Sequence, residues 1–384
     1  MDFLQSISSY LATREAEMIA MLEELVNQDS GSSYKEGVNA IGAKMGAAFE
    51  GLGLNVEVVE QEKNGNHLVI KTKPNEKGGV LILGHMDTVF PKGTAAERPF
   101  TIKGDRAYGP GVSDMKAGLI AIYWALKAIY ELGLDKDAPP LTIILNSDEE
   151  RGSLSSRPLI EREGKEANYV LVAEPARANG AVVTARKGVG HFVLTSKGKA
   201  VHAGAEPENG INAIVDLAAA VLEIHQLNDF AKGTTFNSGV IQGGTASNVV
   251  PDYAAVEIDI RAELMEEAER AVESLQLQAK KQFISGAERT LTGEINRPPM
   301  EKLEQSQELY QLACQLAEKI GFDLPEAMSG GGSDGNFTAA LGIATLDGLG
   351  PVGGGFHSAN EYLELTSIVP RTTLLAGLML SLQA

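Results

Sequence analysis

The chain has almost no cysteine. Cys314 is the only one among 384 residues. No intrachain disulfide can therefore form, and neither a cysteine-ligated zinc site nor an iron–sulfur cluster fits within one chain. A protein without disulfides is typical of a reducing compartment, so this absence favours the cytoplasm.

An excess of basic residues is absent as well. The 33 lysines and arginines are outnumbered by 51 aspartates and glutamates, which gives a formal net charge of −18 at pH 7. Such a charge repels nucleic-acid phosphates and anionic membrane surfaces and favours solubility. We therefore expect neither nucleic acid nor a membrane as a partner.

The sequence also lacks a long apolar run. Its longest apolar stretches, near Leu119 and Ala213, are too short or too interrupted to cross a bilayer. The first residues show no basic start followed by an apolar block and a cleavage site, and their pattern is helical. We expect a cytoplasmic protein.

Length and apolar content predict two domains. The chain is 43% hydrophobic and exceeds the size at which a single core keeps growing. Up to about residue 180, apolar strands alternate with helical patterns, which is typical of an α/β sheet. The predicted helices cover 3–28, 35–52 and 114–132, and the predicted strands 55–60, 67–72, 78–84, 141–147 and 168–174.

The pattern changes at about Ala181 to that of a compact two-layer α+β unit, and it reverts near Arg297. We predict one catalytic domain, 1–184 and 298–384, interrupted by an inserted domain, 185–297. The predicted elements are strands at 188–198, 236–244 and 254–263, helices at 210–228 and 265–284 in the inserted domain, and helices at 304–320 and from about 367 in the returning segment.

Short stretches spread along the chain hold the residue types of a catalytic metal centre. Carboxylate and imidazole ligands without thiolates are typical of catalytic rather than structural zinc sites, and a two-metal site needs about this inventory. The candidates are His85 and Asp87 in LGHMDT, Asp114 in GPGVSDMKAG, Glu149 and Glu150 in LNSDEERG, Glu174 in VAEP, and His357 in FHSANE.

His85 and Asp87 follow a buried strand at a spacing of two. If the strand geometry persists, they point to one side, beyond a carboxyl end where open α/β sheets place their sites. A metal-bound imidazole usually gives its second N–H to a carboxylate or carbonyl, and Asp87 is a candidate for that contact. The alternative is a surface histidine beside a turn aspartate.

The other candidates have ordinary structural alternatives. Asp114 is at a first-turn position of the predicted helix, where aspartate is also a common N-cap. Glu149 and Glu150 repel each other near a shared site, so one of them tends to bind metal or hold a proton, although surface glutamate pairs are common. Glu174 ends an apolar strand, and His357 lies in a loop after glycines that allow tight turns.

Together these motifs resemble the dizinc metallopeptidase and deacylase family. It includes bacterial glutamate carboxypeptidase, acetylornithine deacetylase, succinyl-diaminopimelate desuccinylase and aminoacylase, and the resemblance runs over about residues 80–363. It implies an α/β, zinc-peptidase-like catalytic domain with helices around a mostly parallel sheet. It also implies an inserted α+β, ferredoxin-like lid and dimerisation domain.

The resemblance further implies two zinc ions per chain, with Co²⁺ or Mn²⁺ as substitutes. Asp114 would bridge both ions and Asp87 would orient a ligand, while Glu149 would be the general base. His85 and Glu174 would complete the shell of the first ion, and Glu150 and His357 that of the second.

In the inserted domain, the motifs KAVHAG, GGTASNVVPD and DIRAE imply roles in substrate binding. His202, often contributed across a homodimer, would polarise the scissile carbonyl. Asn248 and Arg261 would hold a terminal carboxylate, which a planar guanidinium matches bidentately. A turn histidine and an exposed charge are the ordinary alternatives. Further predicted substrate contacts are Arg297, Gly331, Gly332 and Ser333.

The predicted function is zinc-dependent hydrolysis of an amide bond next to a free carboxylate. Glutamate at position 174 resembles the carboxypeptidase and deacylase branch of the family, so we predict a carboxypeptidase that releases a C-terminal amino acid, with small peptides as substrates. The alternative is an N-acyl amino-acid deacylase. A non-catalytic metal- or ligand-binding protein is a third hypothesis.

Overall fold

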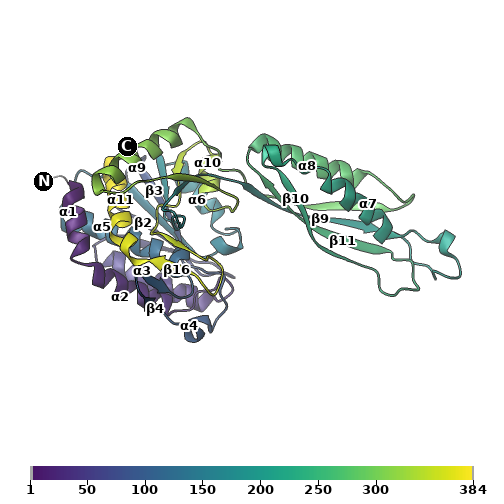
Figure 1. The fold of residues 1–384 in the computed structure, drawn as a ribbon, viewed down its shortest axis with the longest axis horizontal. Helices are drawn as coiled ribbons and strands as arrows, with labels where there is room; N and C mark the ends of the chain where they lie inside the picture. The colour runs from purple at the N-terminus through teal and green to yellow at the C-terminus, as the bar shows by residue number, and fades with distance from the viewer. Residues whose placement is uncertain (1–2, 383–384) are drawn as a thin grey trace. The chain divides into compact units, whose positions relative to one another are not determined.

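The computed structural model describes residues 3–382, and the chain forms two compact units (Figure 1). The first unit contains the residues up to Ala185, Lys302–Met328 and the residues from Ser333 on. The second contains Arg186–Glu301 and Ser329–Gly332.

The first unit is built on a six-stranded sheet with the order β1-β2-β6-β3-β7-β14. The four strands from β6 to β14 are parallel to one another, whereas β2 runs antiparallel to β6, and β1 to β2. The strands are β1 (Asn55–Val59), β2 (His67–Lys71), β3 (Val80–His85), β6 (Leu141–Asn146), β7 (Tyr169–Val172) and β14 (Ala344–Leu346).

Apolar side chains cover both faces of this sheet. Leu81 and Leu83 of β3 belong to a cluster with Leu159 of α6 and Phe337 of α10, whereas Ile82 belongs to the larger core on the other face. Every residue of β3 is buried, as expected of a strand covered on both faces. The helices of the first unit are α1 (Phe3–Ala12), α2 (Glu15–Val26), α3 (Lys35–Glu50), α4 (Thr94–Glu97), α5 (Gly118–Glu131), α6 (Arg157–Gly164), α9 (Glu304–Ile320), α10 (Gly335–Ala340) and α11 (Ile368–Ser381).

Two smaller sheets contain further strands. A four-stranded sheet has the order β15-β16-β5-β4, and β13 pairs with β8. The sequence patterns did not predict the short strands of the four-stranded sheet. These strands are β4 (Thr101–Lys103), β5 (Arg106–Tyr108), β8 (Val182–Arg186), β13 (Glu326–Ser329), β15 (Gly353–Gly354) and β16 (Tyr362–Glu364).

The second unit has a β-α-β-β-α-β order of elements. Its four strands pair antiparallel in the order β10-β11-β9-β12, which is the ferredoxin-like arrangement. Apolar residues of α7 and α8 share one core with the strands. The elements are β9 (Gly188–Lys197), α7 (Ala213–His225), β10 (Thr235–Gly243), β11 (Tyr253–Ala262), α8 (Met265–Lys280) and β12 (Glu288–Arg297).

The predicted fold class is therefore confirmed: a mostly parallel α/β sheet with helices on both faces, together with an α+β ferredoxin-like unit. Some local elements differ from the predictions. The predicted helix 3–28 is two helices, interrupted at Thr13 and Arg14, and β12 was not predicted because its sequence ERTLTGEINR is largely polar.

Candidate metal centre

Neighbouring parallel strands bring three of the candidate segments together. His85 is the last residue of β3, Glu149 and Glu150 follow β6, and Glu174 follows β7. Because β6, β3 and β7 are adjacent and parallel, their carboxyl ends meet at one edge of the sheet. His85 pairs in register with Asn146 of β6, so the end of one strand lies beside the end of the next.

Asp114 reaches the same place from an irregular segment. The prediction that it opens a helix is wrong, because α5 begins only at Gly118, and Asp114 has the non-helical angles φ −107° and ψ 95°. Its peptide bond to Met115 is cis. Its backbone N–H donates to the carboxylate of Glu361 rather than entering a helical ladder, and no side chain caps α5.

The two carboxylate oxygens of Asp114 face two different imidazoles. Its Oδ1 lies 3.3 Å from Nε2 of His85, and its Oδ2 lies 3.3 Å from Nε2 of His357. Glu174 Oε1 lies 3.4 Å from the same nitrogen of His85, and Glu150 Oε2 lies 3.2 Å from that of His357. His357 has a left-handed φ of 58° in the connection between β15 and β16.

The donor atoms fit a metal centre. His85 Nε2 and Glu150 Oε1 are buried without a hydrogen bond of ordinary geometry, which is costly unless another group satisfies them. His85 offers a ligand atom to two groups within 4.8 Å, one with Asp114 and Glu150, the other with Glu149 and Glu174. Imidazole and carboxylate donors together suit divalent transition metals.

The position of the proton on the imidazole of His85 also leaves Nε2 available for a metal. Nδ1 of His85 lies 2.9 Å from the backbone oxygen of Asp87, and a carbonyl can only accept, so Nδ1 carries the proton. The carboxylate Oδ1 of Asp87 is farther, at 3.6 Å. Asp87 is thus the partner of the His85 imidazole, through its main-chain oxygen rather than its carboxylate.

The carboxylate of Asp87 organises the neighbouring turn. It accepts hydrogen bonds from the backbone N–H groups of Glu149, at 3.2 Å, and Glu150, at 3.3 Å, and from the hydroxyl of Ser32, at 2.6 Å. Asp87 therefore fixes both the imidazole of His85 and the short helical turn, Glu149–Arg151, that holds the two glutamates.

Burial and neighbouring charges shift the pKa values of the side chains in the cluster. Burial raises the pKa of Glu174 to about 7, and the nearby carboxylate of Asp114 adds to the rise. Hydrogen bonds to Asp114 and Glu150 raise the pKa of His357 to about 10. Burial opposes the charge on His85, yet the surrounding carboxylates raise its pKa well above the usual value. Without metal the cluster retains protons, and a divalent cation would displace them.

All the predicted substrate residues except Ser333 lie in the second unit, where His202 and Asn248 are neighbours. His202 is exposed and forms a β-bridge with Val249, and the N–H of Ala203 donates to the carbonyl of Asn248 at 2.9 Å. Nδ1 of His202 accepts from the N–H of Gly204.

Arg261 is held by an aspartate on its own strand. Its Nε and Nη2 donate to the two oxygens of Asp259, at 2.8 and 2.9 Å, and its Nη1 lies 3.4 Å from the carbonyl of Gly330. This contact fixes one edge of the guanidinium. Sequence reasoning missed Asp259, whose signal is its spacing of two from Arg261, which places both on one face of β11.

The remaining predicted substrate residues differ in exposure, and the two with polar side chains, Arg297 and Ser333, are buried. Arg297 is buried at the end of β12, and a Cβ built on Gly332 would come within 2.6 Å of the Arg297 side chain. Ser333 is fully buried and its hydroxyl donates to Asp347. Gly331 is exposed. Substrate binding by these four residues stays a prediction, and the Ser333 hydroxyl is already engaged.

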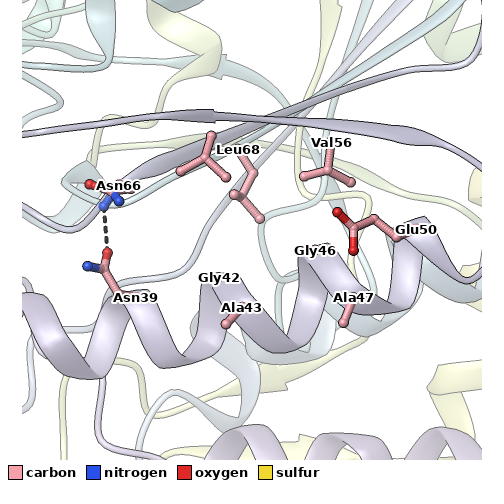
Figure 2. Close-up of a pocket in the computed structure, with 10 residues that line it drawn as sticks. Asn39, Gly42, Ala43, Gly46, Ala47, Glu50, Val56, Asn66 and Leu68 are labelled. Carbon is pink, nitrogen blue, oxygen red and sulfur yellow. Dashed lines mark hydrogen bonds between the residues drawn. The ribbon is translucent and has the colours of Figure 1, made fainter.

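A groove elsewhere on the first unit contains none of these residues. It has a volume of about 360 Å³ and lies between α3 and the strands β1 and β2 (Figure 2). Gly42, Ala43, Gly46 and Ala47 line its helical side, and the backbone N–H of Asn66 donates to Asn39 at one end. It has no metal-ligand cluster and no part in the candidate site.

The fold and the cluster together define a metal-dependent hydrolase: an α/β enzyme whose strand ends gather imidazoles and carboxylates around one shared aspartate. Residues 81–381 match the family model described as Peptidase family M20/M25/M40, and the chain belongs to this family.

Named relatives include both peptidases and deacetylases. Carboxypeptidase G2 of Pseudomonas sp. (strain RS-16) is 34% identical over 96% of this chain and 89% of its own. Acetylornithine deacetylase of Vibrio campbellii is 31% identical over 60% of this chain and 62% of its own.

Solved structures share the fold. Aminopeptidase PepT from Bacillus cereus superposes with a TM-score of 0.77 at 24% identity, covering 95% of this chain and 98% of its own. A dinuclear metal-binding M20 peptidase from Bacillus subtilis superposes with a TM-score of 0.69 at 15% identity, covering 96% of this chain and 98% of its own.

None of the helices within residues 3–382 has the length and apolar character that a membrane span requires.

Proposed function

We propose that the protein is a two-zinc carboxypeptidase that cleaves an amide bond next to a free carboxylate and releases a C-terminal amino acid. The observation that carries this proposal is the position of Asp114, which presents one oxygen to each of two imidazoles. Carboxypeptidase G2, which is similar over nearly the whole chain, supports the peptidase assignment.

The ligand set divides around Asp114. His85 and Glu174 would hold one ion, Glu150 and His357 the other, and Asp114 would bridge them. Zinc suits these donors, with Co²⁺ or Mn²⁺ as substitutes. Two bound ions supply Lewis-acid polarisation of the scissile carbonyl and lower the pKa of a water molecule.

Glu149 would move the proton. It has a carboxylate oxygen within 4.8 Å of the candidate ligand atoms of His85 and Glu174, the residues that would hold the first ion. As the water oxygen bonds to the carbonyl carbon, Glu149 accepts the water proton, and it then donates that proton to the leaving nitrogen as the C–N bond breaks. The products are a carboxylic acid and a free amine.

Residues of the second unit would recognise the substrate. Arg261 and Asn248 would bind the terminal carboxylate, with the guanidinium edge that Asp259 leaves open available for it. His202 would donate to the carbonyl oxygen as negative charge develops on it.

A homodimer through the second unit fits its exposed edge strand. β10 ends the four-stranded sheet, and its Val240 and Ile241 are 52% and 59% exposed. Natural proteins usually protect such an edge, and a second copy would cover it.

We further propose that the protein works in the cytoplasm.

Replacing the proposed base tests the mechanism. Glu149→Gln keeps the size of the side chain but cannot accept a proton, so kcat should fall by about 100- to 10,000-fold. Elemental analysis should still find two metal ions per chain. Glu131→Gln, an exposed position on α5 paired with Lys127, is the matched control and should keep full activity. Wild-type turnover in Glu149→Gln would refute the assignment.

An N-acyl amino-acid deacylase is the second candidate, and the similarity to acetylornithine deacetylases favours it. Both reactions cut an amide beside a carboxylate and use the same residues. We would compare kcat/KM for N-acyl glutamates, dipeptides and N-acetyl amino acids with zinc-reconstituted protein. A preference of kcat/KM for N-acetyl amino acids over every peptide would replace the carboxypeptidase assignment.

A further inference from the structure

Glu361 is a buried carboxylate that the proposed reaction leaves without a role. It is 1% exposed and lies immediately before β16. Its Oε1 accepts from the backbone N–H groups of Ser113 and Asp114, both at 2.9 Å, and its Oε2 accepts from that of Gly111 at 3.0 Å. One side chain therefore binds three main-chain donors of the segment that carries the shared aspartate.

We propose that Glu361 is a positioning residue of the metal centre, which sets the backbone of Asp114 so that its two oxygens face both ions. The proposal rests on the proposed metal centre, since it concerns the residue that would bridge the ions. Glu361 itself contacts neither substrate nor metal in this role.

The segment that carries Asp114 needs an external acceptor. It is not a regular helix at Asp114, so the N–H of this residue lacks the usual acceptor of a helical ladder. Unsatisfied N–H groups in a buried site are costly, and hydrogen bonds to a carboxylate are stronger than neutral ones. Glu361 satisfies three of them at once and thereby selects one backbone conformation.

The hairpin that carries Glu361 also packs tightly on this segment. A Cβ added to Gly353 of β15 would come within 2.0 Å of the Ser113 hydroxyl oxygen, so the hairpin approaches as closely as glycine allows. The same β15–β16 connection contains His357, whose Nε2 lies 3.3 Å from Asp114 Oδ2. One connection would thus supply a ligand of the second ion and fix the ligand shared by both.

Two variants and one control isolate this effect. Glu361→Gln keeps one acceptor oxygen but turns an NH₂ group toward an N–H donor, and Glu361→Ala removes every acceptor. Glu364→Gln is the control, because Glu364 lies on the same strand and pairs with Arg106 at 2.7 Å, away from the cluster. Circular dichroism of the metal-free proteins establishes whether each variant is folded.

The measurement is metal affinity, from titration of the metal-free proteins with Zn²⁺ in competition with a chromophoric chelator. We expect Glu361→Gln to remain folded and to bind metal about 10- to 100-fold more weakly than the wild type, as for other residues that orient ligands. Glu361→Ala should lose more, and Glu364→Gln should match the wild type. The Co²⁺ absorption spectrum of Glu361→Gln should also change, which a purely structural role far from the ions would not cause.

Wild-type affinity and an unchanged Co²⁺ spectrum in folded Glu361→Gln would overturn the proposal. An unfolded Glu361→Gln would overturn it too, because Glu361 would then serve the whole fold. If Glu361→Ala alone fails to fold, Glu361→Gln decides. A wild-type protein that binds fewer than two ions would instead refute the proposed metal centre, so the two failures are distinguishable.

Discussion

The contact between Arg261 and Asp259 orients a guanidinium that we propose binds the carboxylate of the substrate. Asp259 accepts from Nε and Nη2 of the guanidinium, and the proposed carboxylate would bind at the other edge, where Nη1 lies 3.4 Å from the carbonyl of Gly330. A guanidinium that is already oriented before binding loses less conformational freedom when the ligand binds. Asp259 is therefore expected to affect substrate affinity without touching the reacting atoms.

For Arg261→Ala we expect KM for carboxylate-bearing substrates to rise about 10- to 100-fold with a smaller change in kcat, because charge-assisted hydrogen bonds are lost. Asp259→Asn should raise KM less, since one hydrogen bond remains. Glu257→Gln, on the same strand beside His191, is the control and should leave KM unchanged. Steady-state kinetics measure each case. An unchanged KM in Arg261→Ala removes this residue from the pocket.

The sequence predicted the residues that lie together in the candidate metal centre, but it did not predict the residues that hold their backbone. His85, Glu150, Glu174 and His357 lie close to Asp114 in space, as expected if they share a site. Glu361 was not predicted because its role depends on backbone N–H groups about 250 residues away in the chain, and residue type alone does not show such contacts.

At the scale of elements, a charged residue of α8 connects this helix to the turn that precedes β10. Glu267, in its first turn, is 4% exposed and accepts from Arg270, Lys232 and Thr234. Hydrogen bonds from Arg270 and Lys232 lower the pKa of Glu267 to about 2. A lowered pKa in the folded state means that the ionised carboxylate stabilises the protein at neutral pH.

This contribution should depend on pH with a defined sign. It is fully present above the usual glutamate pKa of about 4.5 and is lost as the pH falls toward about 2. Glu267→Gln should therefore lower the urea midpoint of unfolding at pH 7, and the difference from wild type should shrink below about pH 4.5. Glu266→Gln, one exposed position earlier, is the control. A difference that stays constant down to pH 3 would contradict the assignment.

Periodicity predicted the long elements and missed the short ones. The helix Glu304–Ile320 has the predicted bounds, because its apolar residues recur at helical spacing. β4, β5, β15 and β16 have only two or three residues each, too few to show an alternation. Their pairing joins Arg106–Tyr108 with Tyr362–Glu364, a long-range contact that local patterns do not show.

At the scale of the whole molecule, a shared active site has a direct test. If His202 acts on the partner's substrate, a mixture of His202→Ala and Glu149→Gln proteins should form hybrid dimers with one intact site. Random exchange of subunits would restore about a quarter of wild-type activity, since half of the dimers are hybrids with one working site of two. Activity of the mixture after confirmed subunit exchange is the measurement, and each variant alone is the control. No recovery would argue that each chain supplies its own His202.

The sequence by itself determined the chemistry and the classes of the elements. Residue types such as His85 and Asp114 limit the proposed metal ligands to imidazole and carboxylate, and apolar periodicity predicts strands and helices, since both are local properties. The tertiary structure decided which backbone groups meet. The carbonyl of Asp87 fixes the imidazole of His85, and Glu361 holds the segment of Asp114, because buried N–H and C=O groups must find partners wherever the packed chain provides them.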